Sequence, residues 1–125
     1  MTPEVASLKA RLNYVELPVT DAGRSAAFFE AAFGWSMTAF GPSYAATTDG
    51  GAGDGSTDLG LQGDTSEATA APLAVIQVDD LDATLAAVEA AGASITRAPF
   101  DYPGGRRFHF REPGGCELAV NLVRD

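Results

Sequence analysis

Residues 12–19 are rich in hydrophobic residues and are predicted to form a β-strand. One side of this strand would carry Leu12, Tyr14, Glu16 and Pro18, and the other would carry Asn13, Val15, Leu17 and Val19. From residue 22 onward, hydrophobic positions recur every three or four residues, which predicts a helix over residues 22–33. Asp21 is a suitable N-cap for this helix, and Gly34 is a suitable C-terminal stop. The phenylalanines of the helix recur at helical spacing and predict a face that packs in a core: Phe28, Phe29 and Phe33.

Three short strands are predicted after this helix, over residues 35–40, 43–48 and 57–62. Gly41-Pro42 predicts a turn between the first two strands, and the Gly- and Asp-rich residues 49–56 predict a loop. Residues 63–71 are small and polar, which is typical of a linker.

The same order of elements then repeats. A strand is predicted over residues 73–78, and a helix follows over residues 81–91, with Asp80 as its N-cap and Gly92 at its end. Three more strands are predicted, over residues 94–98, 106–111 and 116–122. Sliding the chain so that Val19 lies on Val78 also places Glu30 on Glu89, which supports an internal repeat.

The repeat predicts a single domain over residues 1–125 of the α+β class, built from two βαβββ modules. Module one spans about residues 11–62, the linker residues 63–71, and module two about residues 72–123. Each helix would cover one face of a sheet, and the other faces would form a cupped sheet around a small-molecule cavity.

Composition and charge narrow the function. The chain has 125 residues, 46 % of them hydrophobic, and a formal net charge of −9, which argues against a nucleic-acid or anionic-membrane partner. Cys116 is the single cysteine, so neither an intramolecular disulfide nor a cysteine metal cluster is expected. Residues 1–11 have no apolar run typical of a signal peptide, and no segment reaches transmembrane length, so we expect a cytoplasmic protein.

The basic residues are unevenly distributed. No Lys or Arg occurs between Arg24 and Arg97, whereas four arginines then surround the only histidine, His109: Arg97, Arg106, Arg107 and Arg111. These arginines either neutralise nearby carboxylates or attract an anionic ligand. The acidic composition fits a cationic ligand instead, so the sign of the ligand's charge stays open.

The motifs of both halves resemble those of the vicinal oxygen chelate superfamily, which includes glyoxalase I, bleomycin-resistance proteins and extradiol dioxygenases. The segments that carry the resemblance are Tyr14–Asp21, Ser25–Glu30, Phe33–Trp35, Val78–Leu81, Glu89–Ala93 and Phe110–Leu118. The resemblance implies two βαβββ modules in a cupped sheet, and it implies a homodimer because many members are dimers. Its metal-dependent members hold a divalent ion with His or Glu from the first and last strands of each module.

Those ligand positions do not suit a metal in this chain. Three of them fall on Tyr14, Leu73 and Ala119, and the fourth lies within residues 57–62, where Asp58 and Gln62 are the only oxygen donors. Leucine and alanine cannot bind a cation, and a neutral tyrosine is a poor ligand. We therefore expect no metal and no other cofactor. Without the metal, the usual glyoxalase and dioxygenase mechanisms are not expected either.

Strand alternation from the same positions predicts which side chains line the cavity: Tyr14, Glu16, Val75, Gln77, Glu117, Ala119 and Asn121. Phe108 and Phe110 would pack under a helix, which directs Arg107 and His109 to the cavity. The candidates for acid–base catalysis are Glu16, His109 and Glu117. The candidates for ligand contact are Tyr14, Trp35, Gln77, Arg107 and Asn121.

Three functions remain open. The first is a metal-free glyoxalase-like protein that binds a small polar organic ligand, for example by sequestration in the manner of bleomycin-resistance proteins. The second is a lyase or isomerase that uses Glu16, Glu117 or His109 as a general base, either metal-free or around a relocated metal. The third is a dimeric structural or regulatory module, in which Glu16 and Glu117 simply pair with Arg107.

Overall fold

The computed structural model describes residues 9–124, which fold as two compact units. The first unit comprises residues 13–73, and the second comprises residues 74–124 together with the start of the first strand. The sequence prediction for residues 1–11 lies mostly outside the described residues. Among the described residues, no helix is both long and apolar enough to cross a bilayer.

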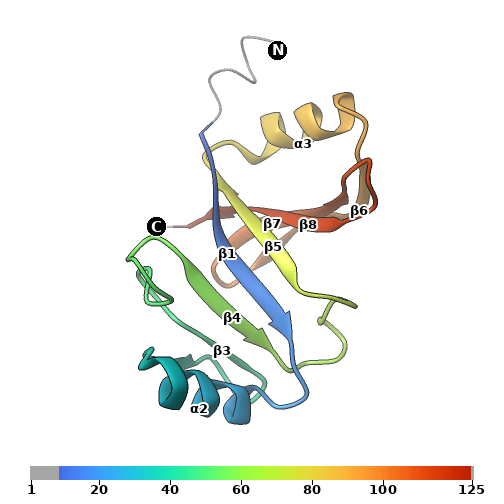
Figure 1. The fold of residues 1–125 in the computed structure, drawn as a ribbon. Coiled ribbons are helices and arrows are strands. Elements are labelled where there is room, and N and C mark those ends of the chain that lie inside the picture. The colour runs from blue at the N-terminus through green and yellow to red at the C-terminus, as the bar shows by residue number, and fades with distance from the viewer. Residues whose placement is uncertain (1–8, 125) are drawn as a thin grey trace. The chain divides into compact units, whose positions relative to one another are not determined.

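The first unit is built around the sheet β2-β3-β4-β1, in which β1 and β4 run parallel and the other pairs are antiparallel (Figure 1). Its elements are β1 (Ala10–Pro18), α2 (Ala22–Phe33), β2 (Thr38–Ala39), β3 (Tyr44–Ala46) and β4 (Asp58–Gln62).

Helix α2 begins and ends where the sequence predicts. The Arg24 amide donates a hydrogen bond to Asp21 Oδ1 at 3.0 Å, which satisfies one of the free donors of the first turn. Gly34 closes the helix with φ 72°, a left-handed conformation that glycine adopts without a Cβ clash, and its amide donates to the Glu30 carbonyl. The helix packs on the apolar face of the sheet, in a core that includes Ala22, Ala45, Leu59 and Leu61.

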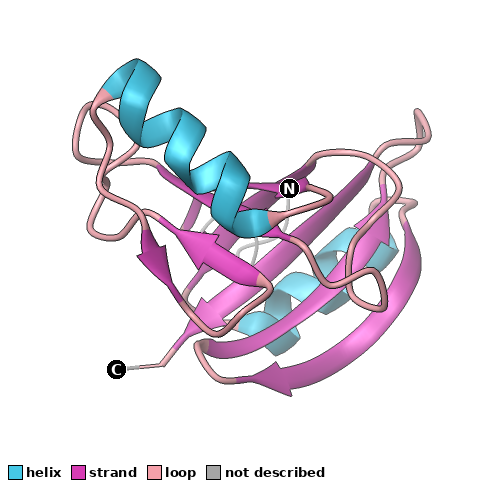
Figure 2. Ribbon diagram, turned by 90° about the horizontal axis from the view of Figure 1, so that it is seen from below, coloured by secondary structure: helices cyan, strands magenta, loops and turns pink. Residues whose placement is uncertain are grey.

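The second unit repeats this plan with the sheet β5-β8-β7-β6, in which β5 and β8 run parallel. Its elements are β5 (Leu73–Val78), α3 (Leu81–Ala90), β6 (Ser94–Tyr102), β7 (Gly105–Arg111) and β8 (Glu117–Val123). Figure 2 separates the helices from the strands by colour. Asp80 caps α3 as predicted, since its Oδ1 accepts a hydrogen bond from the Ala83 amide at 3.0 Å.

The core of the second unit lies between α3 and one face of its sheet. Phe108 and Phe110 are buried there with Val120, and Leu85 of α3 packs against them. This confirms that the two phenylalanines lie under a helix. Because side chains alternate along a strand, His109 of β7 belongs to the opposite face.

Two strands differ from the sequence prediction. The strand predicted over residues 35–40 is reduced to Thr38–Ala39, because Trp35 stacks on the phenylalanines of α2 instead of extending the sheet. Strand β6 runs to Tyr102, beyond the predicted end at residue 98, with register shifts between Ile95 and Phe100. Pro99 lies in this irregular stretch of an edge strand, where its missing N–H is tolerated. The α+β class with a repeated βαβββ plan is confirmed.

Candidate functional site

The polar face of the first unit carries a chain of hydrogen bonds between two tyrosines and a glutamate. The Tyr44 hydroxyl donates to Glu16 Oε2 at 2.9 Å, and it is also hydrogen-bonded to the Tyr14 hydroxyl. Since the single proton of Tyr44 is directed to the carboxylate, Tyr14 is the donor in the second bond. Glu16 is 3 % exposed, so these hydrogen bonds stabilise a carboxylate that is almost completely removed from water.

Tyr44 is held in its neutral form. Burial raises the pKa of the Tyr44 hydroxyl, and the neighbouring Tyr14 and Glu16 raise that pKa further, because a phenolate would be poorly solvated and repelled. The hydroxyl therefore acts as a permanent donor to Glu16 at ordinary pH.

Gly60 makes this arrangement sterically feasible. Gly60 is on β4, directly opposite Glu16 of β1 on one side and Ala46 of β3 on the other. A Cβ at this position would collide with the hydroxyls of both Tyr14 and Tyr44. The absent side chain provides the space in which the two hydroxyls meet.

The oxygen donors that were candidates for a fourth metal ligand are already engaged. The Asp58 carboxylate accepts from Thr47 Oγ1 at 2.7 Å and from the Gly50 and Gly51 amides, so it closes the loop before β4. Gln62 Oε1 accepts from the Asp64 amide at 3.0 Å.

The other positions that the resemblance assigns to a metal do not fit one either. Leu73 and Ala119 are buried and have no donor atom, and the Tyr14 hydroxyl is bonded to Tyr44. Between residues 9 and 124, no three His, Cys, Asp or Glu side chains are arranged so that they could hold a metal ion.

The polar face of the second unit is centred on His109 of β7. His109 Nδ1 lies 3.4 Å from Glu117 Oε2, and the same carboxylate oxygen accepts from Thr96 Oγ1 at 2.8 Å. Ala119 of β8 lies directly opposite His109 of β7, so the imidazole has a short side chain as its neighbour on the next strand. Strand alternation predicts His109 and Glu117 on one face, and in the structure the two side chains are within hydrogen-bonding distance.

His109 is 2 % exposed, and this burial is the largest influence on its charge. Burial lowers the pKa of His109, and the guanidinium groups of Arg107 and Arg97 lower it further, whereas Glu117 raises it. The imidazole is therefore neutral near pH 7. A carboxylate can only accept, so the proton lies on Nδ1 and the lone pair lies on Nε2.

Two hydrogen-bond acceptors on this face are buried and unsatisfied. His109 Nε2 and Asn121 Oδ1 have no hydrogen-bond partner among the described residues. The amide nitrogen of Asn121 donates to the Tyr102 hydroxyl at 3.1 Å, which fixes the orientation in which its oxygen is left over. Buried acceptors of this kind are rare in folded proteins, because each costs about 1–3 kcal/mol if nothing pairs with it.

Aromatic and cationic side chains border the same face. The Phe100 ring lies 6.0 Å from the His109 ring, and Arg97 Cζ stacks 3.6 Å above the Phe100 ring centroid. Arg107 Cζ is 5.5 Å from both the Phe100 and Tyr102 rings. Phe100 is not predicted on this face from the sequence, because the register shifts of β6 break the simple alternation of side chains along the strand.

The remaining predicted residues are divided between the units. Arg107 and Gln77 both lie opposite Asn121, from β7 and β5, so they share the face of His109. Tyr14 and Glu16 lie together in the first unit. Trp35 requires a correction, because it stacks on Phe29 and packs with the helix-side core of the first unit, not with its polar face.

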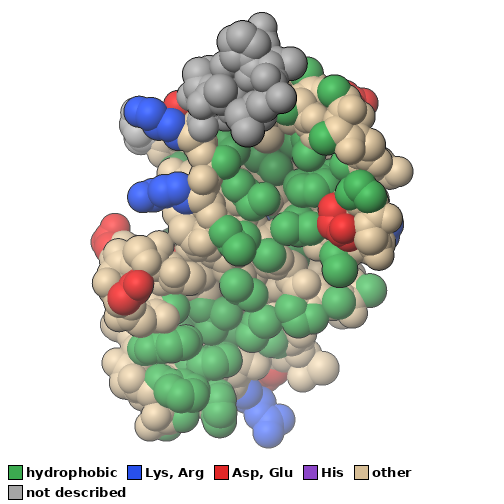
Figure 3. Space-filling view, turned by 45° about the horizontal axis from the view of Figure 1, so that its top comes forward, with side chains coloured by type: hydrophobic (Ala, Val, Ile, Leu, Met, Phe, Trp, Pro, Cys, Tyr) green, Lys and Arg blue, Asp and Glu red, His purple; other side chains and the backbone are tan. Residues whose placement is uncertain are grey.

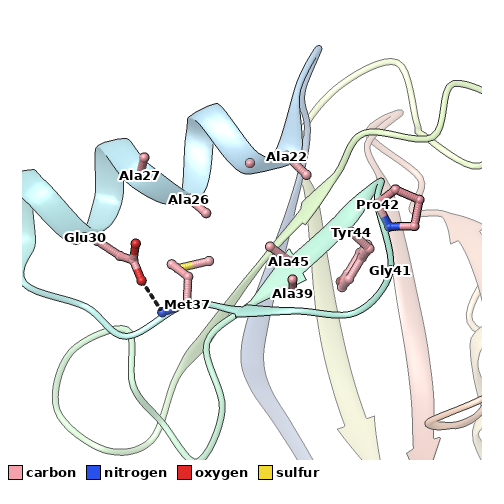
Figure 4. Close-up of a pocket in the computed structure, with 11 residues that line it drawn as sticks. Ala22, Ala26, Ala27, Glu30, Met37, Ala39, Gly41, Pro42, Tyr44 and Ala45 are labelled. Carbon is pink, nitrogen blue, oxygen red and sulfur yellow. Dashed lines mark hydrogen bonds between the residues drawn. The ribbon is translucent and has the colours of Figure 1, made fainter.

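A pocket of about 190 Å³ lies in the first unit between α2 and the strands β2 and β3, and Tyr44 is among the residues that line it (Figure 4). Small side chains of α2 line it, among them Ala22, Ala26 and Ala27. Glu30 Oε2 closes one end by accepting from the Met37 amide at 3.2 Å. None of the residues predicted for catalysis or ligand contact lines this pocket.

Large hydrophobic side chains are also exposed on the described surface (Figure 3). Phe28 and Phe33 of α2 are 58 % and 59 % exposed, although their rings also contact each other edge to face. The phenylalanine stripe of α2 is therefore only partly core, which corrects the sequence interpretation.

Comparison with known proteins identifies the family. The family model "Glyoxalase/Bleomycin resistance protein/Dioxygenase superfamily" matches residues 11–120, and the chain belongs to this superfamily. No protein in a curated collection matches the sequence.

Solved structures share the fold at low sequence identity. The NAD-dependent benzaldehyde dehydrogenase from Legionella pneumophila is 18 % identical with a TM-score of 0.73, covering 90 % of this chain and 99 % of that one. Methylmalonyl-CoA epimerase from Streptomyces coelicolor, in complex with 2-nitronate-propionyl-CoA, is 16 % identical with a TM-score of 0.70, covering 92 % and 98 %.

A third structure is the Mn(II)-bound glyoxalase from Novosphingobium aromaticivorans, with 24 % identity and a TM-score of 0.64. The match covers 94 % of this chain but only 43 % of that glyoxalase, so the present chain corresponds to less than half of it. These likenesses establish the fold, whereas the chemistry depends on the side chains.

Proposed function

We propose that this protein binds a small polar organic ligand on the polar face of the second unit, without a metal. The observation that carries the proposal is the pair of buried acceptors, His109 Nε2 and Asn121 Oδ1, which lack a partner among the described residues. A ligand that donates to both atoms would remove their desolvation penalty. Superfamily members with small-molecule ligands support the proposal, such as the epimerase complex.

Nuclear magnetic resonance of the imidazole tests this proposal directly. The chain contains one histidine, so ¹⁵N-labelled histidine gives signals from His109 alone. We expect ligands from a panel of polar metabolites to move the Nε2 signal in a saturable manner. The variant Asn121→Leu should weaken this binding, whereas Asp82→Asn, an exposed position on α3, should not. A panel in which no compound moves the signal would contradict the proposal.

A second function, proton transfer in a lyase or isomerase reaction, is favoured by the contact between His109 and Glu117. The carboxylate fixes the imidazole tautomer that presents an unprotonated Nε2, which is the arrangement of a general base and its orienting group. Glu16 is a weaker candidate base, because Tyr44 already donates to its carboxylate.

Exchange of a ligand's C–H protons with deuterated solvent tests the second function. We expect His109→Gln to abolish this exchange if His109 is the base. Glu117→Gln should slow it and change its pH profile, because the tautomer is no longer fixed. Exchange at an unchanged rate in His109→Gln would remove His109 from the mechanism.

The homodimer and the cytoplasmic location stay predictions. Sedimentation velocity of the purified protein tests the homodimer. The exposed phenylalanines of α2 are a hydrophobic surface that could associate with a second copy. A monomer at all concentrations would contradict it.

A further inference from the structure

Strand β6 carries one extra residue, Thr96, between two positions that pair with β7. Ile95 lies opposite Phe110, and the next pair joins Arg97 to His109, so two steps along β6 correspond to one step along β7. Bulges of this kind re-aim side chains and are common beside functional sites. Here Ile95 packs with the apolar core, whereas the Thr96 hydroxyl reaches the polar face of the sheet.

On the polar face, the Thr96 hydroxyl meets a carboxylate that comes from two strands away. Strand β7 lies between β6 and β8, and Glu117 is the first residue of β8. Thr96 Oγ1 donates to Glu117 Oε2 at 2.8 Å, and the same oxygen lies 3.4 Å from His109 Nδ1. The hydroxyl of Thr96 and the imidazole of His109 therefore share one acceptor atom.

Glu117 decides which nitrogen of His109 carries the proton. The charged groups that act on the imidazole are Arg107, Arg97 and Glu117. A guanidinium has no acceptor, so among these three groups only the carboxylate can accept from an imidazole N–H. Its contact with Nδ1 selects the tautomer in which the lone pair lies on the buried Nε2.

The carboxylate itself needs a fixed partner to stay at the imidazole. The Glu117 side chain is 25 % exposed, whereas that of His109 is 3 % exposed. A long side chain with access to water loses conformational freedom when it is held in one rotamer, and hydration competes with its hydrogen bonds. Threonine is branched at Cβ and has few χ1 rotamers, so its hydroxyl is a comparatively rigid donor.

We propose that Thr96 is a positioning residue of this site: its hydroxyl holds Glu117 against His109 Nδ1 and thereby keeps the lone pair on Nε2. The inference rests on the proposed function, because a bound ligand or a transferred proton would meet the imidazole at Nε2. Thr96 acts through Glu117, and the bulge of β6 is the backbone feature that makes this contact.

The tautomer of the single histidine measures the role of Thr96 without any ligand. In protein with ¹⁵N-labelled histidine, two-bond couplings to the ring protons distinguish Nδ1 from Nε2, and the ¹⁵N shifts show which one is protonated. At a pH where the imidazole is neutral, we expect the Nδ1–H tautomer in the wild type. Thr96→Val removes the hydroxyl and keeps the branched shape, and valine suits a strand. We expect it to lower the ratio of Nδ1–H to Nε2–H by about tenfold.

Three further variants show whether the effect belongs to the hydroxyl and passes through Glu117. Thr96→Ser keeps a hydroxyl and should keep the wild-type ratio. Thr38→Val changes an exposed threonine of β2 in the other unit and should leave the ratio unchanged. In a Glu117→Ala background, Thr96→Val should have no further effect, because no carboxylate is left to position.

The outcomes separate this inference from the function on which it rests. An unchanged ratio in Thr96→Val, the same change in Thr96→Ser or Thr38→Val, or a further change in the Glu117→Ala background would overturn the role of Thr96. A panel of metabolites that leaves the Nε2 signal unmoved would instead remove the binding function, and the tautomer ratios would still decide the role of Thr96.

Discussion

At the scale of single residues, the charge of His109 follows from its surroundings. The side chain is almost completely buried, two guanidinium groups act on it, and the one nearby carboxylate accepts from Nδ1. The result is a neutral imidazole whose lone pair lies on the buried Nε2 atom. The sequence allowed His109 and Arg107 to be assigned to the right face from the apolar pair Phe108 and Phe110, but it gave no measure of burial, on which the charge state depends.

The lowered pKa of His109 makes stability depend on pH. In the unfolded chain the imidazole titrates near its ordinary pKa of 6.5, whereas in the folded protein it takes up a proton only at lower pH. The unfolded state therefore binds the proton first, and the free energy of unfolding should fall as the pH drops below about 6.5.

Urea denaturation at a series of pH values between about 7.5 and 5 measures this effect. His109→Gln is the control, because it removes this titration while the carboxylates that titrate at lower pH remain. A wild-type pH profile that runs parallel to that of the variant over this range would contradict the assignment.

The tyrosine pair gives a second residue-scale prediction. Tyr44→Phe removes the donor to the buried Glu16 carboxylate, so we expect a loss of about 1–3 kcal/mol in the free energy of unfolding. Tyr14→Phe removes the bond between the two hydroxyls and leaves the bond from Tyr44 to Glu16 in place, so it should cost less. Denaturation of both variants tests the order, and an equal or larger loss in Tyr14→Phe would show that the donor assignment is wrong.

At the scale of elements, both helices form where their caps and spacing predict them. Asp21 and Asp80 each accept from an amide of the first turn, and Gly34 takes a left-handed conformation after α2. Local signals of this kind are contained in a few neighbouring residues, so the sequence suffices to find them.

The ends of the strands are harder to predict from the sequence, because they depend on partner strands that are distant in sequence. Trp35 carries a strand-forming side chain, yet it stacks on Phe29 and Phe33 of α2 instead of joining the sheet. In β6 the register shifts remove the simple period of two, so Phe100 and Tyr102 could not be assigned to the face of His109.

Strand β4 depends on Gly60 at its centre. We expect Gly60→Ala to lower the free energy of unfolding by about 1–3 kcal/mol, because the new Cβ collides with the hydroxyls of Tyr14 and Tyr44. A double-mutant cycle with Tyr44→Phe measures the cause. If the collision with the Tyr44 hydroxyl contributes, Gly60→Ala should cost less in the Tyr44→Phe background. Purely additive losses would place the strain elsewhere.

At the scale of the whole molecule, the family and the chemistry give different expectations about metal. The superfamily match covers residues 11–120, and one structural relative is a Mn(II)-bound glyoxalase. In this chain, however, the positions that the resemblance assigns to metal ligands hold Leu73, Ala119 and a tyrosine that is hydrogen-bonded to Tyr44. Membership of a family fixes the backbone plan, whereas the reaction depends on the side chains placed on it.

Chelation gives the prediction at this scale. Because the described residues do not provide a fitting donor set, we expect treatment with EDTA to change neither the melting temperature nor the binding of ligands to His109. Elemental analysis of the purified protein is the companion measurement. A divalent metal at one equivalent per chain, lost together with stability on chelation, would contradict the expectation.

The small side chain of Ala119 has a consequence for anyone who would engineer this protein. It lies opposite His109, and both residues are buried, so the larger imidazole fills the space between them. A designer who introduces a carboxylate at residue 119 would place a longer side chain directly opposite His109, at two positions that are both buried. We therefore expect such a carboxylate to displace the imidazole that defines the present site.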